Sequence, residues 1–342
     1  MNSPNPSPAV PTEEDLAPTQ DALQRIRDEL NGVLFGQEPL IDLVLIGLLS
    51  RGHLLLEGLP GLGKTELVKA LSTTLGLESK RIQFTPDLLP GDITGNPILE
   101  ETGGQRQFRF QPGPLFSHLC LADEINRASP KTQSALLEAM QERRVTVLGE
   151  THPLPDPFFV LATQNPIELE GTYPLPEAQL DRFLFKLVVP VVDAATLQRI
   201  VEHRELGTTP TVSPVVHREE WRSIQEMARR IFLPEAVAEY IARLVHATQP
   251  GESSCSQSLR FGASPRAALS FAAASKARAL LHGRVNASFE DIRLLAEPIL
   301  AHRITLDYAA KMEGTTAPAV VQKLLQEIPA QAASLPPNLR EQ

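Results

Sequence analysis

An eight-residue stretch has the residue types and spacing of a phosphate-binding loop. It fits the pattern G-x-x-x-x-G-K-[ST] at every fixed position and reads Gly58, Leu59, Pro60, Gly61, Leu62, Gly63, Lys64, Thr65. Glycines let successive backbone N–H groups curl around phosphate oxygens, and the lysine ammonium reaches the β- and γ-phosphates. The threonine hydroxyl can ligate Mg²⁺. This stretch predicts a site for a nucleoside triphosphate and its metal ion.

Two adjacent carboxylates and an amide follow later apolar runs. Residues 118–122 are apolar and lead into Asp123 and Glu124. Asp123 at the end of a strand can hold the Mg²⁺ ion, and Glu124 beside it can orient and deprotonate an attacking water. The next apolar run ends before Asn165, whose amide can position the same water. The alternative is a turn asparagine, because Asn165 precedes a proline.

Short apolar runs alternate with helical segments around these motifs. Strands without a polar alternation, separated by helices, indicate a parallel sheet that is covered on both faces. The expected strands are 53–57, 81–84, 118–122, 158–163 and 184–189, and the expected helices are 64–75, 130–142 and 176–183. Upstream, we expect a helix from Thr19 to Gly32 and a buried helix from Gln37 on.

Two segments depart from this α/β pattern. Gly103–Gly104 separates two short runs within residues 98–110, and Gly149–Glu150 does the same within residues 143–153. Such turn residues between extended runs predict β-hairpins. Both hairpins would be inserted into the α/β domain.

The chain divides into four predicted parts. Residues 1–18 hold five prolines and no aromatic residue, which predicts a disordered tail, with a docking segment for a partner as the alternative. An α/β nucleotide-binding domain follows over 19–190, and a polar linker over 191–215. Residues 216–332 predict an all-α domain with helices over 217–230, 234–248, 265–281, 289–302 and 320–327.

The composition of the chain argues against several other classes of protein. The chain has 32 basic and 41 acidic residues, a net charge of −9, which argues against a protein that coats nucleic acid. Its two cysteines, Cys120 and Cys255, are far apart and belong to no metal-binding cluster. The N-terminus lacks the charged and apolar regions of a signal peptide, and no apolar run is long enough to span a membrane. We therefore expect a soluble, cytoplasmic protein without membrane insertion.

Long stretches of the sequence resemble the MoxR family of AAA+ ATPases. They include RIQFTPDLLPGDITG (81–95) and GASPRAAL (262–269), together with residues 36–71, 108–116, 121–155 and 161–184. The resemblance implies an AAA+ P-loop domain with an α-helical lid, ATP and Mg²⁺ as cofactors, and hydrolysis of ATP. It also implies a homo-oligomeric, hexameric ring that remodels, assembles or matures a protein client. A partner with a von Willebrand A domain, often in metalloenzyme maturation, is implied in the same way.

The resemblance also implies roles for individual residues. Lys64 and Thr65 correspond to the Walker A motif, Asp123 and Glu124 to the Walker B motif, and Asn165 to sensor 1. In addition, the stretch 33–37, with Phe35, Gly36 and Gln37, corresponds to the wall of the adenine site. The hairpins resemble the helix-2 insert and pre-sensor-1 hairpin of the branch that includes magnesium chelatases, although the tip sequence ILEETGGQR carries no transferable meaning.

Three arginines are further candidates. Arg182 matches the family's arginine finger, which reaches the ATP of a neighbouring subunit; the alternative is a solvated Arg182 beside an Asp181 that pairs elsewhere. Arg266 lies at the start of a helix, where a cation opposes the helix dipole unless a phosphate faces it. It therefore resembles a sensor-2 arginine, acting within its own subunit or on the next. Arg127 is a weaker interface candidate.

Two other functions remain open from the sequence. One is a DNA-translocating or metal-chelatase motor of the same branch, against which the acidic composition argues. The other is a slow, nucleotide-gated scaffold, which the presence of both Glu124 and Arg182 disfavours. ATPase turnover with and without DNA would separate these functions from the remodelling ATPase.

Overall fold

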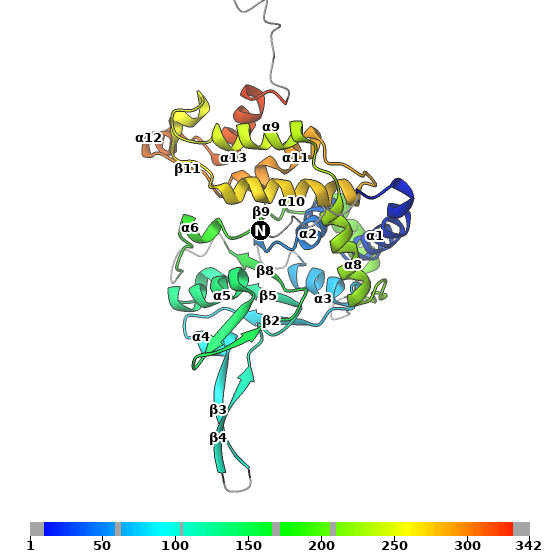
Figure 1. Ribbon diagram of the computed structural model, residues 1–342, viewed down its shortest axis with the longest axis vertical. Coiled ribbons are helices and arrows are strands. Elements are labelled where there is room, and N and C mark those ends of the chain that lie inside the picture. The colour runs from blue at the N-terminus through cyan, green and yellow to red at the C-terminus, as the bar shows by residue number, and fades with distance from the viewer. Residues whose placement is uncertain (1–9, 59–62, 103–104, 166–171, 206–209, 331–342) are drawn as a thin grey trace, which may run out of the picture. The chain divides into compact units, whose positions relative to one another are not determined.

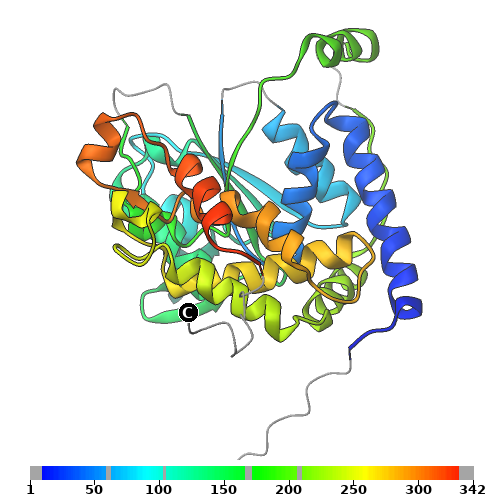
Figure 2. The same cartoon turned by 90° about the horizontal axis from the view of Figure 1, so that it is seen from above.

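The computed structural model describes residues 10–58, 63–102, 105–165, 172–205 and 210–330 (Figure 1 and Figure 2). These residues form two compact units. One comprises residues 15–228, and the other comprises residues 10–14 and 229–330. The predicted α/β and helical parts are both present, but the second unit begins at Arg229 rather than at residue 216.

A five-stranded parallel sheet forms the centre of the first unit, as predicted. Its strand order is β2-β5-β8-β1-β9. The strands are β1 (Leu54–Glu57), β2 (Ser79–Gln83), β5 (Leu119–Asp123), β8 (Phe159–Gln164) and β9 (Phe185–Val188). Successive residues of β1, β5 and β8 are buried, so both faces of the sheet are covered. Because all strands are parallel, their carboxyl ends meet at one edge of the sheet.

Helices surround this sheet. They are α1 (Glu13–Val33), α2 (Glu38–Leu49), α3 (Lys64–Thr74), α4 (Pro90–Thr94), α5 (Pro130–Glu142), α6 (Glu177–Leu180), α7 (Ala194–His203) and α8 (Arg218–Arg230), with a 3₁₀ turn at Ile125–Arg127. The core that they enclose is fully apolar at its centre, where Leu55, Phe84, Leu136 and Val160 have no exposed surface. Helix α8 belongs mainly to the first unit, because Gln225 Nε2 donates to the Leu48 carbonyl at 2.7 Å.

Two predicted boundaries of the first unit were wrong. The expected disordered tail becomes helical at Glu13, because Leu16 is anchored in the core at 1% exposure and acidic residues favour a helix start. The linker expected over 191–215 contains α7. Its start is capped by Asp193, whose carboxylate accepts the Thr196 N–H at 2.8 Å. Proline and polar content had suggested irregular chain in both places.

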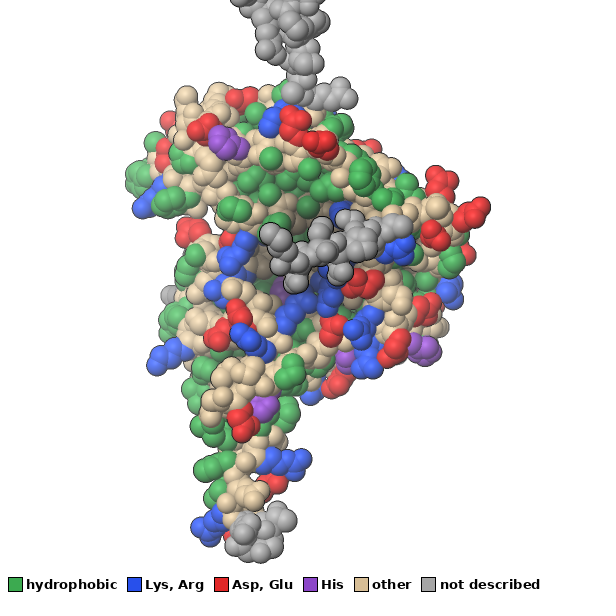
Figure 3. All heavy atoms as spheres, in the orientation of Figure 1, with side chains coloured by type: hydrophobic (Ala, Val, Ile, Leu, Met, Phe, Trp, Pro, Cys, Tyr) green, Lys and Arg blue, Asp and Glu red, His purple; other side chains and the backbone are tan. Residues whose placement is uncertain are grey.

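Both predicted hairpins are present. Strands β3 (Gly95–Thr102) and β4 (Gln105–Pro112) form the longer one, and β6 (Arg144–Val147) and β7 (Glu150–Pro153) the shorter. The long hairpin projects away from the sheet, with hydrophobic and charged side chains along it (Figure 3). Phe110 on β4 stacks on His152 of β7, with ring centroids 4.0 Å apart and planes 11° apart. This stacking joins the two hairpins.

The second unit is mainly helical, as predicted. It contains α9 (Glu235–His246), α10 (Pro265–Leu281), α11 (Phe289–Leu300), α12 (Tyr308–Met312) and α13 (Ala317–Glu327). It is not purely α, because β10 (Leu259–Phe261) pairs with β11 (Thr305–Leu306), and a 3₁₀ turn spans Cys255–Ser258. The buried Asp291 accepts hydrogen bonds from Arg278 and Arg284. Among the described residues, no helix is both long and apolar enough to cross a membrane.

Candidate active site

A cavity of about 730 Å³ in the first unit opens at the carboxyl ends of the parallel strands. Nine residues selected from the sequence line it: Phe35, Gln37, Gly58, Gly63, Lys64, Thr65, Asp123, Glu124 and Asn165. They come from the chain between α1 and α2, from the start of α3, and from the ends of β1, β5 and β8. The fold thus gathers the separate sequence motifs into one site.

The described part of the phosphate-binding loop is shaped for a close backbone approach. Gly63 has a φ of +78°, and a Cβ there would meet the Leu34 side chain at 2.7 Å, so only glycine fits without strain. Lys64 Nζ donates to the Gly58 carbonyl at 2.9 Å. Partial burial lowers the pKa of Lys64, while the Asp123 and Glu124 carboxylates act in the opposite direction. The other predicted loop residues, Leu59, Pro60, Gly61 and Leu62, lie outside the described residues.

Thr163 fixes the acidic pair at the end of β5. Its hydroxyl donates to Asp123 Oδ1 at 2.6 Å and accepts the Glu124 backbone N–H at 2.9 Å. Thr163 itself has no exposed surface, so it cannot move away without disturbing the core. Glu124 adopts a left-handed backbone with a φ of +57°, which ends the strand and turns the chain into the 3₁₀ turn. The sequence analysis missed Thr163.

Two side chains on β2 contact the same carboxylates. Arg81 donates to Asp123 Oδ2 from Nη2 at 2.6 Å and from Nε at 3.2 Å. Gln83 Nε2 donates to Glu124 Oε2 at 2.9 Å, and Arg127 Nη1 reaches the same oxygen at 2.9 Å. The sequence analysis missed Arg81 and Gln83 as well. Their signal is the i, i+2 spacing that places both on one face of a strand beside β5.

The oxygen donors in the cavity suit a hard divalent cation. Thr65 and Asp123, the two predicted Mg²⁺ ligands, both line it. The described residues contain no group of three or more His, Cys, Asp or Glu side chains that could hold a metal ion by themselves. The Thr65 hydroxyl and the Asp123 carboxylate fit Mg²⁺, which usually takes one or two protein ligands together with water and substrate phosphates.

Asn165 follows β8 and lies at the wall of the cavity. It is 8% exposed, and its backbone carbonyl accepts from Asn126 Nδ2 at 3.4 Å. This position next to the end of β5 is compatible with the predicted contact to an attacking water. Its catalytic role and the turn alternative both stay predictions.

Another part of the cavity wall is largely apolar and holds residues of the predicted adenine site. Phe35 lines it together with Leu197 and Ile200 of α7. Gln37 is 5% exposed, and its Oε1 has no hydrogen-bond partner among the described residues. A Cβ at Gly36, with a φ of +69°, would meet Thr196 Oγ1 at 2.5 Å, so Gly36 permits close packing and does not itself line the cavity.

Arg204 holds this wall in place. Its Nη2 donates to the Gly32 carbonyl at 3.1 Å and to the Val33 carbonyl at 2.9 Å. Its guanidinium also lies 5.4 Å from the centre of the Phe35 ring. The segment after α7 is therefore tied to the turn before α2. The sequence analysis missed Arg204 because it treated residues 191–215 as a linker.

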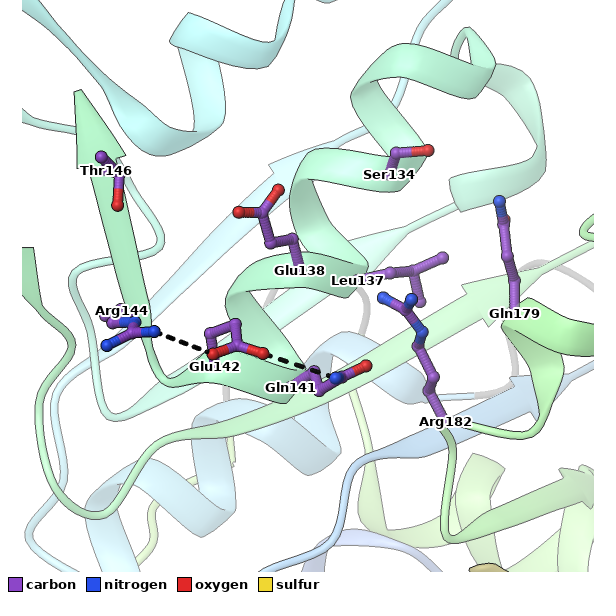
Figure 4. Close-up of a pocket in the computed structure, with 9 residues that line it drawn as sticks. All are labelled: Ser134, Leu137, Glu138, Gln141, Glu142, Arg144, Thr146, Gln179 and Arg182. Atoms are coloured by element: carbon purple, nitrogen blue, oxygen red, sulfur yellow. Dashed lines mark hydrogen bonds and ion pairs between the residues drawn. The ribbon is translucent and has the colours of Figure 1, made fainter. Parts of the chain in front are cut away.

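Arg182 does not line this cavity. It lies in a separate pocket of about 470 Å³ beside α5 and the shorter hairpin, where Glu138, Glu142 and Arg144 also lie (Figure 4). Its Nε is buried and has no hydrogen-bond partner among the described residues. A role at the nucleotide of its own subunit is disfavoured by this placement, while a role at a neighbour's nucleotide stays a prediction.

Arg266 lies in the second unit, at the start of α10. Ser264 caps this helix, and its hydroxyl accepts the Arg266 backbone N–H at 3.2 Å. The predicted helix start is therefore confirmed, while the sensor-2 role stays a prediction.

Known protein families match the two parts of this chain, and one match includes the motifs that line the cavity. The family described as "ATPase family associated with various cellular activities (AAA)" matches residues 53–185, and the AAA lid domain matches residues 251–324. The first match covers the segment from β1 to the start of β9, which contains the phosphate-binding loop, the acidic pair and Asn165.

Full-length relatives extend the match to most of the chain. Chaperone MoxR1 of Mycobacterium tuberculosis is 41% identical over 339 residues, covering 96% of this chain and 89% of that protein. Protein MoxR of Paracoccus denitrificans is 32% identical, covering 90% and 97%. YeaC of Bacillus subtilis is 43% identical, covering 94% and 99%.

A solved structure shares the fold. The crystal structure of a protein from Cytophaga hutchinsonii superimposes with a TM-score of 0.86 at 39% identity, covering 93% of this chain and 97% of the other. Family, relatives and fold thus agree with the motifs gathered in the cavity. The chain belongs to the MoxR family of AAA+ ATPases, and the reaction it catalyses is the hydrolysis of ATP.

Proposed function

We propose that this ATPase hydrolyses ATP in order to remodel, assemble or mature a protein client. The observation that carries the proposal is the convergence of Lys64, the Asp123–Glu124 pair and Asn165 on one cavity. The name of the mycobacterial relative, a chaperone, supports the client part. We also propose that this chain forms a hexameric ring in the cytoplasm. The proposed partner carries a von Willebrand A domain.

In the proposed reaction, Lys64 binds the β- and γ-phosphate oxygens. Thr65 and Asp123 hold the metal ion, which when bound supplies a Lewis acid that neutralises phosphate charge. Asn165 orients a water, and Glu124 accepts its proton as the water oxygen attacks the γ-phosphorus. The bond from that phosphorus to the bridging oxygen breaks, which releases ADP and phosphate.

Arg182 is proposed to complete the site of a neighbouring subunit. Its separation from the cavity of its own subunit supports a contact with another copy. A cation that reaches the γ-phosphate from a neighbouring subunit stabilises the negative charge of the transition state. Arg266 is proposed to contact the nucleotide as well, from the second unit.

Turnover of wild type and of Glu124→Gln, each with and without DNA, tests this proposal. We expect Glu124→Gln to bind ATP but not to hydrolyse it, because an amide cannot accept the proton of the water. Wild-type turnover should not respond to DNA. Strong stimulation by DNA would instead support a translocating motor, and near-normal turnover of Glu124→Gln would place the base elsewhere.

A further inference from the structure

Both carboxylate oxygens of Asp123 already accept hydrogen bonds from side chains of the same unit. Thr163 donates to Oδ1 at 2.6 Å, and Arg81 donates to Oδ2 from Nη2 at 2.6 Å and from Nε at 3.2 Å. The Asp123 side chain is 16% exposed, whereas that of Arg81 is 51% exposed. The proposed metal ligand is therefore already neutralised by a cation of the protein.

We propose that Arg81 is a place-holding cation that competes with the nucleotide-bound metal ion for Asp123 Oδ2. This inference rests on the proposed role of Asp123 in holding that ion. Mg²⁺ requires a near-octahedral set of oxygens at short distances, and it brings two positive charges. A guanidinium on the same oxygen repels the ion and blocks its approach, so the ion and Arg81 occupy Asp123 in turn.

Of the two side chains bound to Asp123, Thr163 and Arg81, only Arg81 is free to move away from the carboxylate. Thr163 is fully buried and also accepts the Glu124 N–H, so its contact with Oδ1 is fixed. Arg81 stands on the edge strand β2 and is half exposed, and its Nη2 also donates to Gln83 Oε1 at 2.7 Å. Exchange of cations therefore takes place at Oδ2 and requires only a change of the Arg81 side-chain conformation.

Removing the Arg81 guanidinium should have opposite effects on the binding of metal-free nucleotide and on the binding of the metal ion. Without Arg81, Asp123 keeps an uncompensated negative charge, which repels a metal-free triphosphate. The same charge attracts a divalent cation that no longer has a competitor. A purely structural tie between β2 and β5 predicts a different result, namely weaker binding of nucleotide and metal together.

Binding of a fluorescent ATP analogue, mant-ATP, to the full chain distinguishes these outcomes. It is measured once in EDTA and once with increasing Mg²⁺. For Arg81→Met we expect the half-saturating Mg²⁺ concentration to fall about two- to five-fold, the range that one partly exposed ion pair supports. Affinity for mant-ATP in EDTA should fall at the same time. Arg81→Lys keeps the charge and should return both values toward wild type.

Arg218→Met is the matched control. Arg218 is 47% exposed at its side chain, pairs with Glu219 at 2.8 Å and does not line the cavity. This variant makes the same change of charge away from the site and should behave as wild type. Circular dichroism of all variants checks that they fold.

Mn²⁺ binding to the nucleotide-free chain gives a second readout, from the electron paramagnetic resonance signal of free Mn²⁺. Arg81→Met should bind Mn²⁺ more tightly than wild type. An unchanged or higher metal requirement, or a parallel loss of both affinities, would overturn the role of Arg81. Failure of wild type to bind mant-ATP would instead contradict the proposed nucleotide site, and the Mn²⁺ comparison would still decide the role of Arg81.

Discussion

Thr163 and Asp123 are joined by a hydrogen bond of 2.6 Å between the ends of two neighbouring parallel strands. The Thr163 hydroxyl also accepts the Glu124 backbone N–H, so one buried side chain contacts the Asp123 carboxylate and the Glu124 main chain. The acidic pair is therefore contacted from both neighbouring strands, by Thr163 of β8 and by Arg81 and Gln83 of β2.

Replacing Thr163 by valine should slow ATP hydrolysis. Valine keeps the shape but loses the hydroxyl, so Asp123 and Glu124 lose their common hydrogen-bond partner. We expect kcat to fall about 10- to 100-fold, as for other groups that orient a metal ligand. Thr163→Ser, which keeps the hydroxyl, should stay close to wild type. Equal loss in both variants would mean that packing, and not the hydroxyl, determines the rate.

Lys64→Ala should abolish ATP binding, because the β- and γ-phosphates lose their main cation. Lys69→Ala is the control, since Lys69 is exposed on the same helix and does not line the cavity. Calorimetric titration with ATP measures the dissociation constant of both variants. Near-normal affinity of Lys64→Ala would contradict the phosphate-binding assignment.

Gln37→Leu should reduce discrimination between ATP and GTP. We propose that the buried Gln37 Oε1, which lacks a partner among the described residues, accepts from the amino group of adenine. Guanine carries a carbonyl oxygen at the corresponding ring position, which an acceptor repels. We expect about tenfold weaker ATP binding in the variant, the cost of losing a buried hydrogen bond, with little change for GTP. Parallel changes in both dissociation constants would contradict this role.

Mixing two inactive variants tests whether Arg182 acts on a neighbouring subunit. Arg182→Ala and Glu124→Gln should each be inactive alone. In a head-to-tail ring formed from equal amounts, about one interface in four combines an intact Glu124 with an intact Arg182. ATPase activity should therefore reappear, up to about a quarter of wild type if the sites act independently.

The control for this experiment is native mass spectrometry, which shows whether mixed rings form. If they form and activity stays at zero, Arg182 does not act between subunits. Arg127 and Arg266 would then be the remaining candidates for that function.

His53 should make the first unit less stable in acid. Burial, opposed by a hydrogen bond to the Met140 carbonyl and aided by the charge of Arg143, lowers the pKa of His53 from 6.5 to about 4. The unfolded chain therefore binds a proton that the folded chain excludes. This contribution to stability is fully present above pH 6.5 and is lost as the pH falls toward 4, by about 3 kcal/mol in total.

Urea unfolding between pH 4 and 7, followed by the fluorescence of the buried Trp221, measures this effect. His53→Gln removes the titrating group and should flatten the dependence of the unfolding free energy on pH in this range. Parallel curves for variant and wild type would contradict the role of His53.

The sequence predicted those parts of the fold and site that depend on local patterns. The spacing from Gly58 to Thr65 and the acids after an apolar run are such patterns, and the described parts of both line the cavity. Arg81, Thr163 and Arg204 were missed because their contacts depend on strand order and on α7. The i, i+2 spacing of Arg81 and Gln83 places both on one face of their strand, but it does not show that this strand lies beside β5. Arg182 lies in a separate pocket, so its predicted role at a neighbour's nucleotide stays a prediction.

The stacking of Phe110 on His152 gives the long hairpin a mechanical property. Each of its strands has eight residues, or about 26 Å at the usual rise per residue. Because Phe110 near the base stacks on the shorter hairpin, which directly follows α5, we expect the two hairpins to turn together. The long hairpin is then a lever arm: a rotation of about 10° at its base would carry its tip about 5 Å. Its apolar pair, Leu99 and Phe108, would move with it.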